Sequence, residues 1–203
     1  MGTVDIVTKE YMRENAIFAD VFNYLIYGGK KVIDPAGLTE VDTATSAVGK
    51  KDALQKYRDV LKAAVIKQDE KMSYVLLGVE NQTDVHYAMP VRNAIYALQY
   101  GKQVSDIAAG HRRSQKDYSG KTGGEYLSGF LKEDHIKPVI TLVIHFGAEE
   151  WDGPLSLHEM MPIRDMEILS YVENYRIHLI DPAKLTEEEL NKFSTSMRAV
   201  SYT

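Results

Sequence analysis

The run 75–82 (Val-Leu-Leu-Gly-Val-Glu-Asn-Gln) constrains the fold most, because an apolar stretch ends abruptly in a carboxylate and two amides. Side chains alternate along a strand, so Glu80 and Gln82 project together from one face. An unpaired buried carboxylate is costly, which favours a partner for Glu80 where the strand leaves the core. The run therefore predicts a buried strand that carries a polar site at its carboxyl end.

A second strand is predicted to end near Ile66, and the polar residues that follow it as far as Lys71 predict a short turn. Two strands joined by so short a loop form an antiparallel hairpin. If Ile66 pairs with Lys71, Asp59 lies opposite Gly78, with Glu80 as its diagonal neighbour on the same face, roughly 7–8 Å away. Carboxylates at that separation can share one divalent cation. A slip of one residue would turn Asp59 to the other face.

Composition limits the classes of protein that the chain can form. With 203 residues, 44% of them hydrophobic, it can bury one substantial core, and the absence of cysteine excludes disulfides and thiolate metal sites. No apolar stretch approaches the roughly 20 residues of a membrane span, and residues 1–10 lack the apolar core of a signal peptide. We expect a soluble, cytoplasmic protein. Its net charge of −5 gives no general attraction for nucleic acid, so a site for a polyanion must be local or recruit metal.

The order of expected elements predicts one α/β domain over residues 1–203 with a mixed central sheet. Residues 36–52 and 110–124 are expected as loops, and 124–131 as a short strand or turn. Hydrophobic periodicity and capping signals predict the remaining elements. They are a helix at 9–27 ended by Gly28-Gly29, the hairpin 55–82, a helix at 90–109, a strand at 138–146, a helix at 155–161, a strand at 175–180 and a last helix opened by Thr186 with Glu189.

This ordered combination resembles the PD-(D/E)xK nuclease superfamily, whose fold is restriction-endonuclease-like. It is most similar to the transposase-like branch related to recombination-promoting nucleases. The resemblance covers nearly the whole chain and rests on the combination of its stretches, each weak alone. They are 18–25, 57–60, 78–83, 86–93, 99–100, 138–144 and 151–157. The resemblance also implies that a further helical region usually follows such a domain.

What the resemblance implies is hydrolysis of DNA phosphodiester bonds with Mg²⁺ or Mn²⁺, in recombination or transposition-like DNA breakage. Asp59 and Glu80 would hold the metal, and the carbonyl oxygen of Asn81 would be a further ligand. Asp20 could reach the metal as an extra acid or remain an exposed helix carboxylate. Mg²⁺ favours a few carboxylates together with waters and substrate phosphate, which agrees with a site that has only these few protein ligands.

Gln82 departs from the family pattern, which most often has lysine at this position. An amide can orient a water but can neither act as a base nor supply positive charge, although Glu-x-Gln variants are compatible with activity in this superfamily. Arg92, on the following helix, is the nearest candidate for the missing cation. A DNA-contacting loop and a solvated loop both fit the basic residues Arg112, Arg113, Lys116 and Lys121.

Two other functions fit the same residues. Because of Gln82, the chain could be a catalytically inactive, nuclease-derived module that binds DNA or protein. It could also be a metal hydrolase of small phosphoesters. An enclosed pocket would favour that function, whereas a basic groove beside the acids would favour DNA cleavage. No membrane partner is expected, and a monomer and a homodimer are equally compatible with the sequence.

Overall fold

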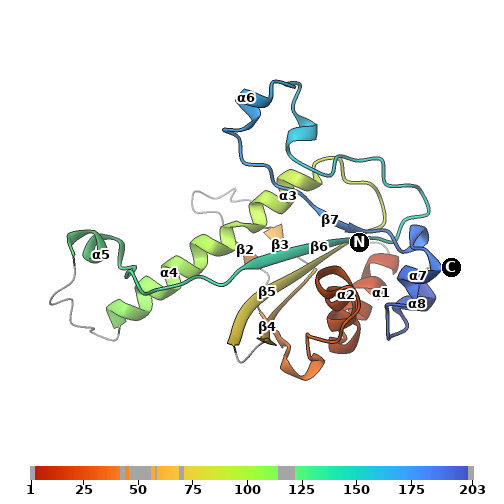
Figure 1. Ribbon diagram of the computed structural model, residues 1–203, viewed down its shortest axis with the longest axis horizontal. Coiled ribbons are helices and arrows are strands. Elements are labelled where there is room, and N and C mark those ends of the chain that lie inside the picture. The colour runs from red at the N-terminus through yellow and green to blue at the C-terminus, as the bar shows by residue number, and fades with distance from the viewer. Residues whose placement is uncertain are drawn as a thin grey trace.

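A five-stranded mixed sheet forms the centre of the computed structural model, which describes residues 3–41, 44–45, 56–57, 59–68, 71–113 and 122–200 (Figure 1). The strand order is β1-β4-β5-β6-β7; β1, β4 and β5 pair antiparallel, whereas β5, β6 and β7 pair in parallel. The predicted α/β fold with a mixed central sheet is thus confirmed, and it is compatible with a nuclease-like α/β fold. The strands are β1 (Thr39–Glu40), β4 (Val60–Gln68), β5 (Lys71–Gln82), β6 (Val139–His145) and β7 (His178–Ile180), with a separate antiparallel pair of β2 (Ala44–Thr45) and β3 (Lys56–Tyr57).

Helices flank both faces of this sheet (Figure 1). α1 and α2 cover one face with the C-terminal α7 and α8, and α3 and α4 run along the other. Among the described residues, no helix is long and apolar enough to cross a membrane. The α-helices are α1 (Thr3–Arg13), α2 (Asn15–Tyr27), α3 (Met89–Tyr96), α4 (Leu98–Arg113), α5 (Gly123–Ser128), α6 (Met166–Leu169), α7 (Glu187–Leu190) and α8 (Met197–Val200), and the 3-10 helices are η1 (Pro35–Gly37), η2 (His158–Met160) and η3 (Pro182–Lys184).

The main core lies between α2 and the sheet. Phe18 and Phe22, four residues apart on α2, are fully buried against strand residues such as Val60, Leu77 and Val79. Alternate positions of β4 and β5 supply this apolar face, as strand geometry requires. Glu80 follows Val79 and therefore projects from the opposite face, toward α3.

Lys62 is a buried cation within this apolar face and is 1% exposed. Its ammonium donates hydrogen bonds to the carbonyl of Arg13 and to Asn15 Oδ1, the latter at 2.6 Å, and lies 5.0 Å from the ring centroid of Phe18. Burial lowers the pKa of Lys62; the Glu40 carboxylate opposes the shift and Arg13 adds to it. Through these contacts, Lys62 links β4 to the junction between α1 and α2.

Two segments differ from the expected secondary structure. The predicted helix 9–27 is divided in two at Glu14, whose ψ of 121° is extended, while Gly28 ends α2 in the left-handed region at φ 61°, as its position predicted. Residues 123–128 form α5, so the expected strand or turn there is wrong. Thr122 and Glu125 make a reciprocal capping box that starts this helix.

The hairpin of β4 and β5 is confirmed, but its predicted register is wrong by two residues. Ile66 pairs with Ser73, and the ladder continues to a pair between Gln68 and Lys71, because these polar residues belong to the strands. Val60 pairs with Val79, so continuing the ladder by one residue sets Asp59 directly opposite Glu80. A shift of two residues preserves the face on which each side chain lies.

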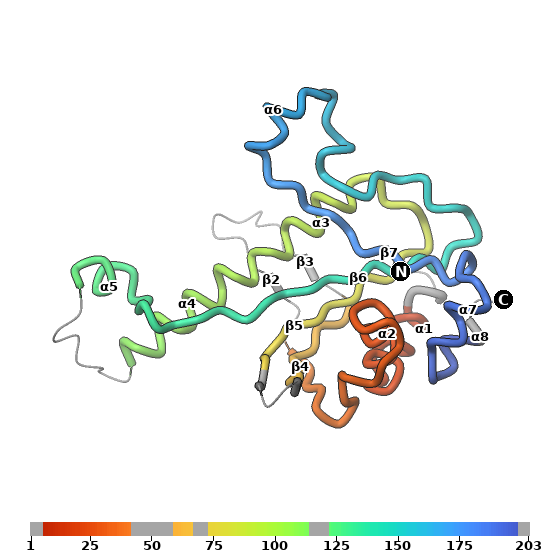
Figure 2. The backbone as a smooth tube through the Cα atoms, in the orientation of Figure 1, coloured from red at the N-terminus to blue at the C-terminus, as the bar shows by residue number. Residues whose placement is uncertain are grey.

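Helical crossovers join the parallel strands. The chain leaves β5, passes through α3, α4 and α5, and returns as β6, which lies between β5 and β7. A strand that is apolar on both faces is typical of such an internal position. Figure 2 shows that the segments around α5 and α6 both project from the body of the protein. Because β5, β6 and β7 are parallel, their carboxyl ends share one edge of the sheet, and Glu80 lies at that edge.

Candidate metal and phosphate site

Glu80 contacts two side chains of α3, Arg92 and Tyr96, which also contact each other. Its carboxylate is 0% exposed; Oε2 lies 2.9 Å from Arg92 Nη2, and Oε1 accepts a hydrogen bond from the Tyr96 hydroxyl. Arg92 Nε in turn donates to the Tyr96 oxygen at 2.8 Å. The predicted need of Glu80 for a buried partner is confirmed, and Arg92 is that partner.

Helix α3 presents both partners because Arg92 and Tyr96 are four residues apart and share one face. Burial, and next the charge of Glu80, raises the pKa of Tyr96 well above its ordinary value, so the hydroxyl remains a donor at neutral pH. Burial by itself would lower the pKa of Arg92, but the charge of Glu80 and the nearby Tyr96 outweigh it and raise that pKa. The guanidinium is therefore a permanent positive charge beside Glu80.

Asp59 lies just before β4 and extends the hairpin by a side-chain contact. Its Oδ2 accepts a hydrogen bond from the backbone N–H of Asn81 at 2.8 Å, and its Oδ1 lies 4.0 Å from Lys9 Nζ on α1. The carboxylate thus occupies the place of a ladder acceptor beside the end of β5. Asp59 and Glu80 are brought to the same end of two neighbouring strands.

A cavity of about 340 Å³ opens at this end of the hairpin. Gln82 lies in its wall, and its amide Nε2 donates to the backbone carbonyl of Asn81 at 2.8 Å. That carbonyl, a predicted metal ligand, therefore already has one donor, although its oxygen has a second lone pair. The lining residues are Asp59, Asn81, Gln82, Thr83, Asp84, Val85, His86 and Arg92.

The donors at this site fit a hard divalent cation in their chemistry. The carboxylates of Asp59 and Glu80 and the carbonyl of Asn81 are oxygen ligands of the kind that Mg²⁺ prefers. Within the part of the chain that the structure describes, no group of three or more histidine or acidic side chains could hold a metal ion. Mg²⁺ usually takes one or two carboxylates and completes its shell with water and phosphate, so Asp59 and Glu80 are enough acids. Glu80 would have to exchange the Arg92 contact for the metal.

The structure reassigns Asp20 from metal binding to a structural role. Its carboxylate is 6% exposed and accepts hydrogen bonds from the backbone N–H groups of Ser194 and Thr195 and from both of their hydroxyls, at 2.7–3.0 Å. Five such contacts fasten the C-terminal segment to α2. The helix face that appeared solvent-directed in the sequence is covered by residues 194–195.

Of the basic residues expected as a DNA-contacting or solvated loop, Arg112 and Arg113 do not adjoin this site. Arg112 and Arg113 end α4, whose 16 residues run along the sheet away from α3 (Figure 1). At about 1.5 Å per residue, roughly 24 Å of helix separates them from the end that follows Tyr96. Lys116 and Lys121 lie outside the described residues.

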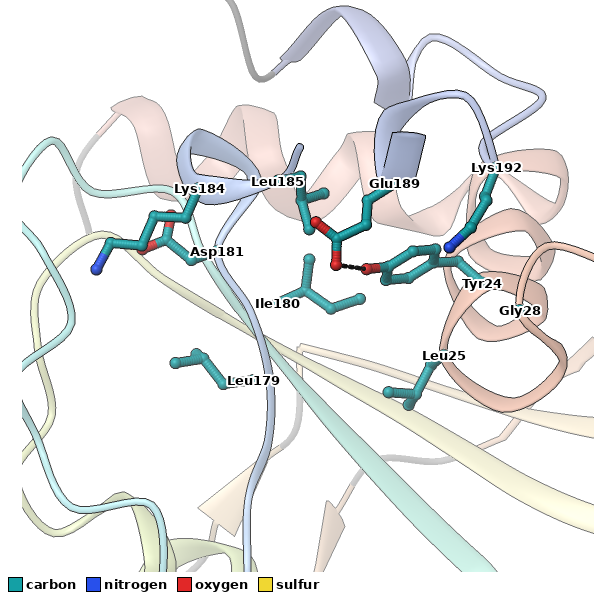
Figure 3. Close-up of a pocket in the computed structure, with 10 residues that line it drawn as sticks. All are labelled: Tyr24, Leu25, Gly28, Leu179, Ile180, Asp181, Lys184, Leu185, Glu189 and Lys192. Carbon is teal, nitrogen blue, oxygen red and sulfur yellow. Dashed lines mark hydrogen bonds between the residues drawn. The ribbon is translucent and has the colours of Figure 1, made fainter. Parts of the chain in front are cut away.

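A second cavity, of about 460 Å³, lies between α2, β7 and α7 (Figure 3). Its charged groups have partners in the protein: the Tyr24 hydroxyl donates to Glu189 Oε1 at 3.2 Å, and Lys184 pairs with Glu150. Leu25 and Ile180 contribute apolar surface. The Tyr24–Glu189 contact joins α7 to α2, and the Lys184–Glu150 pair links η3 to the segment that follows β6.

Tyr96 and Lys9 are the site residues that the sequence-based assignment did not include. The spacing of Arg92 and Tyr96 on one helix was a usable signal, since a tyrosine four residues from a charged site residue lies on the same face. Lys9 reaches Asp59 from a helix distant in sequence, and no local pattern indicates that contact.

Comparisons of this chain with models of protein families, with curated proteins and with solved structures give no match. The assignment of function therefore rests on the geometry of the site and on the resemblance of its motifs.

Proposed function

We propose that this protein is a metal-dependent endonuclease that hydrolyses DNA phosphodiester bonds with Mg²⁺ or Mn²⁺. The observation that supports the proposal most is the joint position of Asp59 and Glu80 at one end of two paired strands, beside a cavity that Arg92 lines. The PD-(D/E)xK resemblance supplies the reaction class, and a cytoplasmic location and a role in recombination or transposition-like breakage belong to the same proposal.

Asp59 and Glu80 would hold the metal, which would supply an activated water and offset charge on the scissile phosphate. Tyr96 keeps the Glu80 carboxylate oriented through its hydroxyl. Arg92 offers a planar guanidinium that matches phosphate geometry. Gln82 can orient a water by hydrogen bonding, but it cannot remove a proton, so the base is not assigned to it.

The inactive binding module is the second candidate, and one observation favours it. Glu80 is 0% exposed and already has a full positive charge 2.9 Å away in Arg92, so its charge is balanced without metal. In that reading the network stabilises the end of the hairpin, and the cavity binds DNA or protein without turnover.

Cleavage of supercoiled plasmid tests the first proposal. Wild type should nick the plasmid with Mg²⁺ or Mn²⁺ and not with EDTA, and both Asp59→Asn and Glu80→Gln should abolish the activity. Asp106→Asn, which removes an exposed acid on α4, is the matched control and should cleave like wild type. Undiminished cleavage by both site variants would assign the activity elsewhere. DNA binding without cleavage under any metal would favour the binding module.

A further inference from the structure

Arg92 contacts both the buried acid and the cavity. Its side chain is 24% exposed and lines the cavity, whereas the Glu80 carboxylate that it contacts is 0% exposed. A phosphate that enters the cavity therefore meets the guanidinium before it can approach Glu80. The guanidinium has five N–H donors in a fork that fits carboxylate and phosphate equally well.

In the free protein, the charge of Glu80 favours the observed position of Arg92 beside it. A buried carboxylate without a compensating charge is costly, and Arg92 supplies that charge. When another positive charge neutralises Glu80, the carboxylate no longer needs Arg92 as its counter-charge. Two cations beside one carboxylate also repel each other. The exposed side of Arg92 then gives it access to an anion in the cavity.

We propose that Arg92 is an exchangeable counter-ion, which holds Glu80 in the free protein and turns to a DNA phosphate once the charge of Glu80 is neutralised in another way. This inference rests on the proposed function and adds to it a coupling between metal binding and DNA binding. Tyr96 is fully buried and remains with Glu80, so it acts as a positioning residue for the carboxylate. By thermodynamic linkage, each ligand then strengthens the binding of the other, typically by about 5–150-fold.

The exchange can be tested without metal, because Glu80→Gln neutralises the carboxylate while it keeps the shape and the acceptor oxygen for Tyr96. A fluorescently labelled mixed-sequence DNA duplex is titrated in EDTA over a range of NaCl concentrations. Wild type, Glu80→Gln and Glu80→Gln/Arg92→Ala form the series. Asp84→Asn removes an equal charge from the lining of the same cavity, and Asp84 is not among the residues assigned to the metal or to the Glu80 network, so it is the matched control.

The slope of log affinity against log salt distinguishes a new phosphate contact from a general loss of negative charge. Glu80→Gln should steepen this slope by about 0.9, the value for one added contact to B-form DNA. The double variant should return to the wild-type slope. Asp84→Asn should strengthen binding without a change in slope. The double variant lacks both charges of the buried pair, so it can fold even if Arg92→Ala alone does not. Its salt slope can therefore still be compared with that of Glu80→Gln.

Equal slopes for wild type and Glu80→Gln, or a steep slope that persists in the double variant, would overturn the exchange. If wild type cleaves plasmid but shows such slopes, the exchange fails and the nuclease stands. If the slopes follow the prediction but no metal supports cleavage, the exchange stands and the nuclease fails. Absence of DNA binding in EDTA by wild type and by Glu80→Gln would overturn the exchange, and plasmid cleavage with metal then decides the nuclease separately.

Discussion

Removal of the Arg92 side chain should destabilise the fold, because it leaves a fully buried carboxylate without its counter-charge. Loss of one partner of a buried ion pair costs about 3–5 kcal/mol. Since 24% of the Arg92 side chain is exposed and the Tyr96 hydroxyl still donates to Glu80, we expect the lower end, about 3 kcal/mol. For a chain of this size that corresponds to a fall in Tm of roughly 6–12 °C.

Urea denaturation followed by far-UV circular dichroism measures this loss as a shift in midpoint at constant slope. Glu80→Gln/Arg92→Ala removes the unpaired charge and should recover most of the stability that Arg92→Ala loses. Arg164→Ala, an exposed arginine outside the site, should stay within about 0.5 kcal/mol of wild type. The reasoning is refuted if Arg92→Ala is as stable as the Arg164 variant, or if the double variant is no more stable than the single one.

Three further outcomes follow from the site and the core. Gln82→Lys should keep or raise plasmid cleavage, while Gln82→Ala should lower it within the roughly 10²–10⁴-fold range of positioning or acid–base groups; equal rates for both would remove Gln82 from the mechanism. Because burial lowers the folded-state pKa of Lys62, the unfolded chain binds more protons between that value and about 10.4, so urea midpoints of wild type should rise relative to Lys62→Met as the pH increases through this window. A constant difference between the two proteins would contradict the shift. Replacing both Arg112 and Arg113 by alanine should reduce the salt slope of DNA binding by about 1.8 if each contacts a phosphate, and an unchanged slope would show that DNA does not extend along α4.

Strand alternation in the sequence was sufficient to place Glu80 at the carboxyl end of a buried strand, and the contact with Arg92 came from the structure. The register assumed for the hairpin was wrong, yet Asp59 still came to the same end, because an error of two residues preserves the face of every side chain. The cause of the error is that Gln68 and Lys71 were assigned to the turn by polarity. Backbone pairing sets the length of a ladder, so polar residues can belong to its strands.

The contacts that sequence reasoning could not supply are those between distant segments. Asp20 was expected either to reach the metal or to remain an exposed helix carboxylate, but residues 194–195, about 170 positions later, donate hydrogen bonds to it. The approach of Lys9 to Asp59 is of the same kind. In contrast, the local signal for α5 was present in Thr122 and Glu125, a capping box identical in type to the one that correctly predicted α7.

The position of a divalent cation tests the central claim most directly. Crystals of the protein grown with Mn²⁺ and a short DNA duplex can be examined by anomalous scattering at the manganese edge. We predict a peak within coordination distance of the carboxylates of Asp59 and Glu80, with the Arg92 guanidinium withdrawn from Glu80 and directed to a phosphate. Ordered DNA with no peak at this position, and with Arg92 still paired to Glu80, would contradict the account.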